Sequence, residues 1–225
     1  MLKDPLVCLN KMLPEIVLSD KKKSILFIEN RIENDVVVAA PHHAPLGIPE
    51  LPCCPEPKNA DENVGFLAYY TSKLLNCSVV IACNYFIDCN KCDDSDYFKI
   101  ISKWNPNILI EIHGHGGTSS KYDIEISSGR KENDKYSIRL AECIKSKTDE
   151  ISMLKKYSIS GDYDKIHFKA TKSKTINTDK WIAFHIELPK TLRSNEIEYK
   201  IFCEILSSAI NDILKKLDSM TENFE

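Results

Sequence analysis

The sequence predicts a three-layer α/β/α domain built around a central sheet that is mostly parallel or mixed. Short apolar segments rich in β-branched residues alternate along the chain with amphipathic segments of helical periodicity, the pattern of a sheet covered by helices. The 225 residues suffice for one domain with a buried core, and no segment has the character of a second unit. We therefore expect one domain over residues 1–225.

Apolar runs and helical stripes predict the individual elements. The expected strands are residues 24–30, 35–40, 77–83, 107–113, 123–128 and 181–189. The expected helices are residues 60–76, 95–104, 135–147 and 195–217. In the first helix, one apolar stripe comprises Val64, Leu67, Ala68, Thr71, Leu74 and Leu75, with Asp61 and Glu62 in the first turn. Proline clusters predict irregular structure for residues 41–59, and residues 158–177 are expected to form loops and short strands.

Composition excludes several classes of partner. The chain is 43% hydrophobic and 28% charged, which is typical of a folded globular protein. Its formal net charge of −3 creates no field that would attract nucleic acid or anionic lipid. No apolar run has the length of about 18 residues that a membrane helix needs. The nine cysteines are odd in number, and several lie in apolar runs, so we expect reduced thiols and a cytoplasmic protein.

Polar clusters follow three of the predicted strands. Residues 41–43 (PHH), 113–115 (HGH) and 185–189 (HIELP) each lie at or just after the end of an apolar run. Functional groups of open α/β sheets collect beyond the carboxyl ends of the strands. We therefore expect these three clusters to meet at one site.

The residue types at this site are those of a catalytic zinc centre. Such a centre needs three protein ligands, usually histidine and carboxylate, and one open position. The sequence offers His42 or His43, Asp61 or Glu62, and His113 or His115. Each histidine could instead be an ordinary hydrogen-bonded residue of the core or surface. Each carboxylate could lie in the first turn of a helix because it interacts favourably there with the helix dipole. The concentration of four of the six histidines at two strand ends favours metal binding.

Other residues are candidates for the chemistry and for substrate binding. Glu187 lies in an apolar strand, where a charged group needs a partner, and near zinc it could act as the general base and acid. Asn90 and Lys91 are donors suited to a substrate carboxylate, and Arg193 could do the same or stabilise an oxyanion. Glu187 could equally form a structural ion pair.

Two different functions compete with the enzyme. The chain could be a catalytically silent α/β protein that binds a metal or another ligand. Cys89 and Cys92 form a single C-x-x-C motif, which could be a redox pair or half of a structural zinc site. A second motif of this kind is missing, and Cys53 and Cys54 are adjacent rather than spaced as ligands.

In order, these motifs resemble those of the N-formylglutamate amidohydrolases, a branch of the zinc carboxypeptidase and aspartoacylase-like hydrolases. The resemblance rests on PHHAPLGIP, ADENVGFL, FIDCNK, EIHGHG and HIELP, which lie between residues 36 and 193. It implies a zinc carboxypeptidase-like fold (phosphorylase/hydrolase-like) and an enzyme that cleaves an amide bond in a small carboxylate-bearing substrate, such as an N-acyl amino acid or a short or γ-glutamyl peptide.

Carried over by position, the resemblance makes His42 and His113 ligands of one zinc ion and favours Asp61 over Glu62 as the third. It implies Glu187 as general base and acid. The sequence departs from the family at Lys91, where the family has arginine. It also departs at two positions where the family has small or hydroxyl residues. The histidines there, His43 and His115, could support the metal ligands or could contact the substrate.

Overall fold

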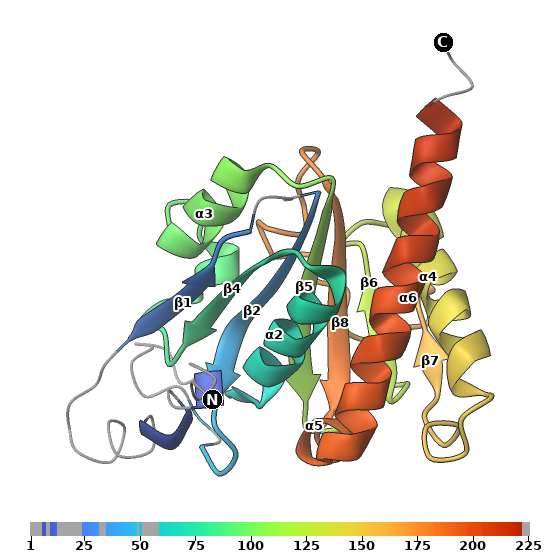
Figure 1. Cartoon of the computed structure of the whole chain (residues 1–225), viewed down its shortest axis with the longest axis horizontal. Helices are drawn as coiled ribbons and strands as arrows, with labels where there is room; N and C mark the ends of the chain where they lie inside the picture. The colour runs from blue at the N-terminus through green and yellow to red at the C-terminus, as the bar shows by residue number, and fades with distance from the viewer. Residues whose placement is uncertain are drawn as a thin grey trace.

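A computed structural model shows the predicted α/β architecture, with one eight-stranded sheet among the residues described (Figure 1). The structure describes residues 6–7, 10–12, 24–31, 35–48, 50 and 59–221. The strand order is β1-β4-β2-β5-β8-β6-β7, and β3 pairs with β2 outside this path. The bounds of the strands are Ile25–Glu29 (β1), Val36–Ala44 (β2), Asp61–Glu62 (β3), Ser78–Cys83 (β4), Ile108–His115 (β5), Ile124–Ser127 (β6), Ile159–Ser160 (β7) and Ile182–Pro189 (β8).

The centre of the sheet is parallel and its flanks are antiparallel. Strands β4, β2, β5 and β8 run in one direction, while β1 pairs antiparallel with β4 and β6 antiparallel with β8. The four parallel strands therefore bring their carboxyl ends to one edge of the sheet, at the bottom of Figure 1. The sheet is mixed, as the sequence predicted.

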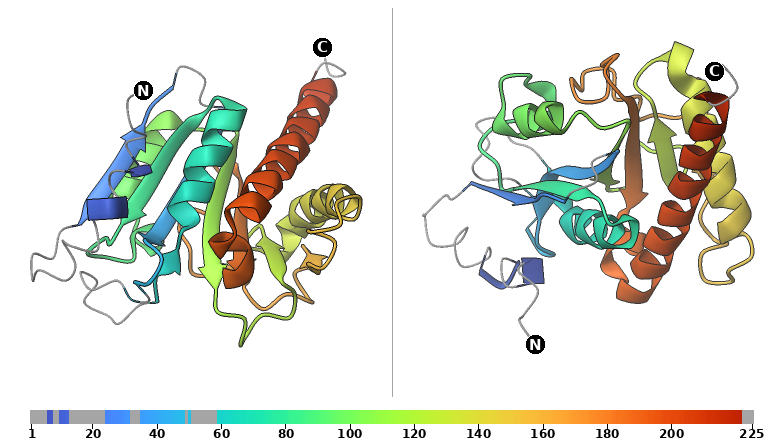
Figure 2. Two further views of the ribbon diagram at one scale, coloured as in Figure 1. Left: turned by 60° about the horizontal axis from the view of Figure 1, so that its bottom comes forward. Right: turned by 45° about the horizontal axis from the view of Figure 1, so that its top comes forward.

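Helices cover both faces of the sheet, which gives the three layers (Figure 2). Helix α6 (Glu196–Thr221) packs against both α2 (Val64–Leu75) and α4 (Asp134–Thr148) on one face. Helix α3 (Asp96–Trp104) lies on the other face and contacts β4 and β2. Short helical segments complete the described elements: η1 (Cys89–Lys91), η2 (Lys131–Asn133) and α5 (Lys190–Ser194).

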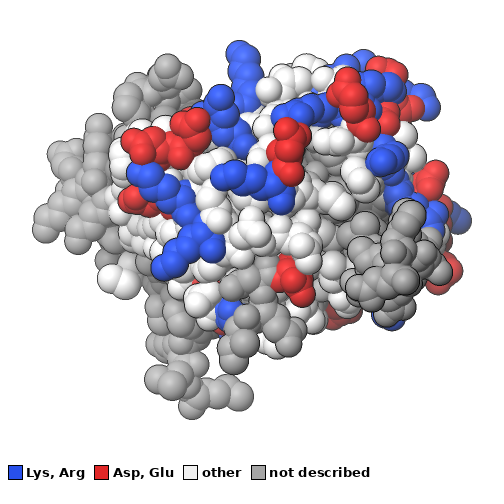
Figure 3. Space-filling view, turned by 90° about the horizontal axis from the view of Figure 1, so that it is seen from above, with Lys and Arg blue, Asp and Glu red and all other residues white. Residues whose placement is uncertain are grey.

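Strand alternation divides the apolar core into two clusters. In β2, Val36, Val38 and Ala40 face α2, α4 and α6, whereas Val37 and Ala39 face α3. Parallel strands that are buried on both faces have nearly continuous apolar sequences. The central strands could therefore be recognised in the sequence. None of the described helices is long and apolar enough to cross a membrane. The face above the amino ends of the strands mixes Lys and Arg with Asp and Glu (Figure 3).

The structure corrects two predictions around the site. Strand β2 continues through Pro41 to Ala44, where irregular structure was predicted. Asp61 and Glu62 form β3, not the first turn of a helix, because they pair with the extended end of β2. The chain then turns at Asn63, whose left-handed φ of 71° separates β3 from α2.

The remaining predictions concern the apolar stripe of α2, residues 158–177 and the proline-rich segment. Leu74 is 41% exposed, because α2 turns this position of the predicted stripe towards solvent. Residues 158–177 contain only β7 and loops, as expected. Cys53, Cys54 and most of the proline-rich segment lie outside the described residues.

Candidate active site

Four ionisable side chains project from neighbouring strands β5 and β8 onto the face that α3 covers. The two strands are parallel and in register, with Glu111 opposite His185 and His113 opposite Glu187. Since side chains alternate along a strand, Glu111 and His113 share the face of Leu109, which belongs to the apolar cluster beneath α3. All four are buried, between 0% and 7% exposed.

A bulge in β2 decides which of its two histidines joins this group. Between Ala40 and His43 the strand contains one residue more than its partner β4, so the alternation shifts there. His43 consequently shares the face of Ala40 and accepts a hydrogen bond at Nδ1 from the backbone N–H of Gly65 at the start of α2. His42 points to the opposite face, towards His113, and the two ring centroids are 5.1 Å apart.

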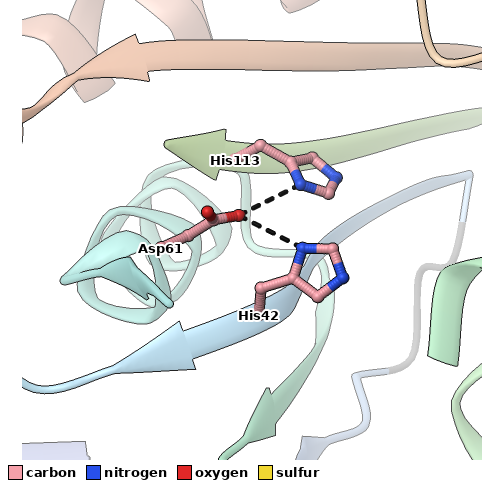
Figure 4. Close-up of side chains that lie close together, drawn as sticks. All are labelled: His42, Asp61 and His113. Carbon is pink, nitrogen blue, oxygen red and sulfur yellow. Dashed lines mark hydrogen bonds and ion pairs between the residues drawn. The ribbon is translucent and has the colours of Figure 1, made fainter. Parts of the chain in front are cut away.

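Asp61 joins His42 and His113 from β3 (Figure 4). Its Oδ2 lies 3.3 Å from His42 Nδ1 and 3.1 Å from His113 Nδ1. These three residues come from β2, β3 and β5, so the convergence of strand ends predicted from the sequence is present in the structure.

A carboxylate holds the second nitrogen of each of these histidines. His42 Nε2 lies 2.8 Å from Asp88 Oδ1, and His113 Nε2 lies 3.2 Å from Glu111 Oε2. Such partners fix the orientation of a metal-binding imidazole and raise its basicity. Glu111 is itself held by three donors on surrounding elements: Tyr97, Thr175 and Asn90.

The electrostatics of this cluster favour a bound cation. Burial raises the pKa of Asp61, but hydrogen bonds with His113 and His42 outweigh it and hold the pKa well below its ordinary value. Burial likewise raises the pKa of Glu111, yet His113 and Thr175 bring it down to about 2. Burial lowers the pKa of His113, whereas Asp61 and Glu111 raise it to about 10. The fold thus keeps two carboxylates ionised on either side of His113, which releases its ring proton when Nδ1 binds a metal.

The donor atoms also have the spacing of metal ligands. His42, Asp61 and His113 each offer one ligand atom, and these lie within 4.8 Å of one another. Ligands about 2.0–2.2 Å from a tetrahedral zinc ion are about 3.4 Å apart, close to the two distances that join Asp61 to the histidines. A second possible set, Glu111, His113 and His185, shares His113. Its Glu111 carboxylate already accepts hydrogen bonds from two hydroxyl groups and an amide, so the first set fits an ion better.

The cluster opens into a cavity of about 550 Å³. Glu187 lines this cavity, with Oε1 3.0 Å from His185 Nε2, and among the described residues its buried Oε2 has no hydrogen-bond partner. Lys91 lines it as well and forms an ion pair of 2.8 Å with Asp88. Asn90 is also present, but its amide donates to Glu111, so its unpartnered atom is the acceptor Oδ1 rather than the expected donor.

Three candidates from the sequence do not lie in this cluster: Glu62, His43 and His115. The carboxylate of Glu62 pairs with Lys190 at 2.7 Å and accepts a hydrogen bond from a backbone N–H. His43 faces α2, and burial lowers its pKa to about 3. His115 faces the backbone carbonyl of Asp123, 2.8 Å from its Nε2.

Arg193 does not face the cavity into which the metal cluster opens. Its side chain packs against the carboxyl ends of the strands. It donates to the backbone carbonyls of Leu188, Glu62 and His115, which joins the ends of β8, β3 and β5. A side chain at Gly114 would overlap the Arg193 guanidinium, so glycine is required there. The arginine stabilises the site from below, in contrast to the substrate or oxyanion contact that we expected.

Sequence reasoning missed Glu111, His185 and Asp88. Glu111 and His185 occupy alternate positions with His113 and Glu187 in two apolar strands, E-x-H and H-x-E. This alternation of ionisable residues was the signal that could have identified them. Asp88 lies in a loop, where its place in FIDCNK, one of the motifs that carry the family resemblance, was the signal that could have identified it.

The segment 167–173 was also missed as a wall of the cavity. The buried carboxylate of Glu125 accepts hydrogen bonds from the backbone N–H groups of His167 and Phe168, both at 2.8 Å. Ala170 has a left-handed φ of 52°, a conformation that L-residues adopt at a cost of about 1–2 kcal/mol. Asn177 donates to the carbonyls of Ala170 and Ser173 and holds this turn.

Cys89 and Cys92 do not form a disulfide in the structure. Cys89 is fully buried, with Sγ 3.5 Å from the carbonyl oxygen of Pro41. Among the residues described, neither cysteine belongs to a group that could hold a metal. The geometry gives no support to a redox or zinc-binding role for this pair.

No protein-family model and no curated protein matches the sequence. Solved structures do match. A bacteriophage poly-gamma-glutamate hydrolase is 13% identical, with 88% of this chain and 95% of the other covered and a TM-score of 0.54. The gene product Atu2144 of Agrobacterium tumefaciens is 14% identical, with coverages of 84% and 94% and a TM-score of 0.54.

A further neighbour, at a TM-score of 0.49, is the catalytic domain of CwlV, an N-acetylmuramoyl-L-alanine amidase from Bacillus (Paenibacillus) polymyxa, 14% identical over 80% of this chain and 98% of the other. The resemblance to N-formylglutamate amidohydrolases, which no family model supports, stays a prediction. The protein has the α/β fold that it shares with the poly-gamma-glutamate hydrolase and with Atu2144.

Proposed function

We propose that the protein is a zinc-dependent hydrolase that cleaves an amide bond in a carboxylate-bearing substrate. The observation that carries the proposal is the set His42, Asp61 and His113. Asp61 Oδ2 lies 3.3 and 3.1 Å from the Nδ1 atoms of the two histidines, all three ligand atoms lie within 4.8 Å of one another, and the set opens into a cavity that Glu187 also lines. The fold is compatible with this chemistry, because one protein that shares it is a poly-gamma-glutamate hydrolase.

Each residue of the cluster has a role in this proposal. His42, Asp61 and His113 would hold the ion, which supplies the Lewis acidity that polarises a carbonyl group and acidifies water. Glu187 takes the proton of the attacking water and transfers it to the departing nitrogen. His185 donates from Nε2 to one oxygen of Glu187 and so orients the other, Oε2, for which the described part of the chain supplies no competing partner.

The cations of the cavity suit an anionic substrate. Lys91 lines the same cavity as Glu187; its ammonium group pairs with Asp88 at 2.8 Å and is 44% exposed, so it can also contact a substrate carboxylate. Substrates with this chemistry include N-acyl amino acids such as N-formylglutamate, and short or γ-glutamyl peptides.

The test is the hydrolysis of a panel of such amides by the zinc-loaded protein and by Glu187→Gln. We expect kcat to fall by about 10²–10⁴ in the variant, since it lacks the proton acceptor, while its zinc content is unchanged. The matched control is Glu142→Gln, because Glu142 lies on α4 with its side chain 63% exposed. If the wild type binds zinc and hydrolyses no member of the panel, the protein is a catalytically silent metal-binding protein instead.

A further inference from the structure

A second cavity adjoins the proposed active site. Its volume is about 360 Å³, and residues 114–119 after β5 form much of its lining. Asn59 and Phe168 line both this cavity and the one that contains the metal cluster. The two cavities therefore lie on either side of a shared wall. Asp61 lines the first cavity, and its neighbour Glu62 lines the second.

The second cavity leaves room for a chain to approach the backbone closely. Gly116 and Gly117 have no side chains, and a Cβ at either position would meet no atom of the described residues within 4 Å. Phe168 stacks on His115 with ring centroids 5.6 Å apart, which fixes the shared wall. The cavity is thus open and preformed, and none of its lining residues belongs to the metal cluster.

Both cavities contain cationic side chains. In the second, the ammonium group of Lys190 is exposed and pairs with Glu62 at 2.7 Å, while Arg193 is buried beneath and adds a positive charge without reaching a ligand. The hydrogen bonds of Arg193 all go to backbone carbonyls, so no carboxylate neutralises it directly.

In the first cavity, the lining includes Lys91, Lys169 and Lys172, two of them from the ordered segment 167–173. The carboxylates of that lining, Asp61 and Glu187, are already engaged by histidines. Cations therefore flank the metal cluster on both sides of the shared wall. A ligand with a single carboxylate would use only one of these sides.

We propose that the two cavities form one cleft for an oligomeric substrate, a chain of amide-linked acidic units. The chain lies across Asn59 and Phe168, with its carboxylates towards the lysines on both sides and the scissile amide at the metal cluster. A monomeric N-acyl amino acid would leave the second cavity empty. This inference rests on the proposed function, because the cluster must cleave the amide that the cleft positions. In that hydrolysis the water oxygen bonds to the carbonyl carbon, the C–N bond breaks and the nitrogen receives the proton.

Binding of oligoglutamates to zinc-loaded Glu187→Gln tests the cleft independently of turnover. The probes are diglutamate and hexaglutamate, each with α-linked and with γ-linked units, measured by calorimetry. We expect the hexamer of one linkage to bind about tenfold more tightly than its dimer, because it occupies both cavities. The linkage that shows this dependence identifies the substrate. Hexaglutamine is expected to bind no more tightly than the dimer, since its side chains are amides and carry no carboxylates.

The variant Gly116→Leu fills the second cavity without touching the metal cluster. Its φ lies outside the left-handed region and its Cβ position is open, so leucine is tolerated there. We expect hexamer affinity to drop to the dimer value while dimer affinity is unchanged. Ser146→Leu, at an exposed position of α4, is the matched control.

Two results would overturn the cleft: equal binding of dimer and hexamer for both linkages, or a length preference that Gly116→Leu leaves intact. A hexaglutamine that binds as tightly as hexaglutamate would overturn its acidic specificity. Failure of the proposed function is distinguishable, because it would show as an absence of hydrolysis by the zinc-loaded wild type even where binding depends on length.

Discussion

Replacement of Glu111 by glutamine tests whether this buried carboxylate supports the metal site or belongs to it. The residue is completely buried, and its Oε2 lies 3.2 Å from His113 Nε2. Its Oε1 accepts hydrogen bonds from Tyr97 at 2.9 Å and Thr175 at 2.8 Å. Glutamine keeps the shape of the side chain but removes the charge that raises the basicity of His113.

The expected loss of zinc affinity follows from this supporting role. Removal of such a partner costs about 10–100-fold in metal affinity, or about 1.4–2.7 kcal/mol. The assay is competition for zinc against a chromophoric chelator, with Glu142→Gln as the control. An affinity within twofold of wild type would refute the supporting role. A loss as large as that of Asp61→Asn would show that Glu111 is itself a ligand, as in the set with His113 and His185.

Two further predictions concern stability. Gly114→Ala should lower the free energy of unfolding by about 1–3 kcal/mol, because the new methyl group overlaps the Arg193 guanidinium; unchanged denaturant midpoints would contradict that packing. Burial lowers the pKa of His43 to about 3, below its value of about 6.5 in the unfolded chain. The contribution of neutral His43 to the free energy of unfolding is therefore complete above pH 6.5 and is lost as the pH falls towards 3. Burial also lowers the pKa of His185, which acts in the same direction. Between pH 6.5 and 4.5, urea titrations should show stability declining by at least about 1 kcal/mol per pH unit, and a flat profile would argue against a neutral His43 packed on Gly65.

The order of strands and helices was readable from sequence because the central strands are buried on both faces. Runs such as residues 79–83 and 108–110 are continuously apolar, and the segments between the strands have clear helical stripes. The paired residues Asp61 and Glu62 were misassigned for a physical reason. A two-residue strand has no periodicity, and its pairing with β2 depends on contacts distant in sequence.

The candidate site was partly predictable for related reasons. Sequence indicated that histidines at strand ends would converge, but the choice between His42 and His43 depends on a bulge that shifts the alternation by one residue. The choice of Asp61 over Glu62 likewise follows from which face of β3 meets the histidines. Arg193 looked like a functional cation, and only its three backbone acceptors show that it joins strand ends.

The most direct test of the metal site is a crystal structure of the zinc-loaded protein with anomalous scattering measured at the zinc edge. We expect one peak, about 2.0–2.2 Å from His42 Nδ1, His113 Nδ1 and Asp61 Oδ2. A peak coordinated by Glu111, His113 and His185, or no peak at full zinc saturation, would contradict the site on which the proposed chemistry depends.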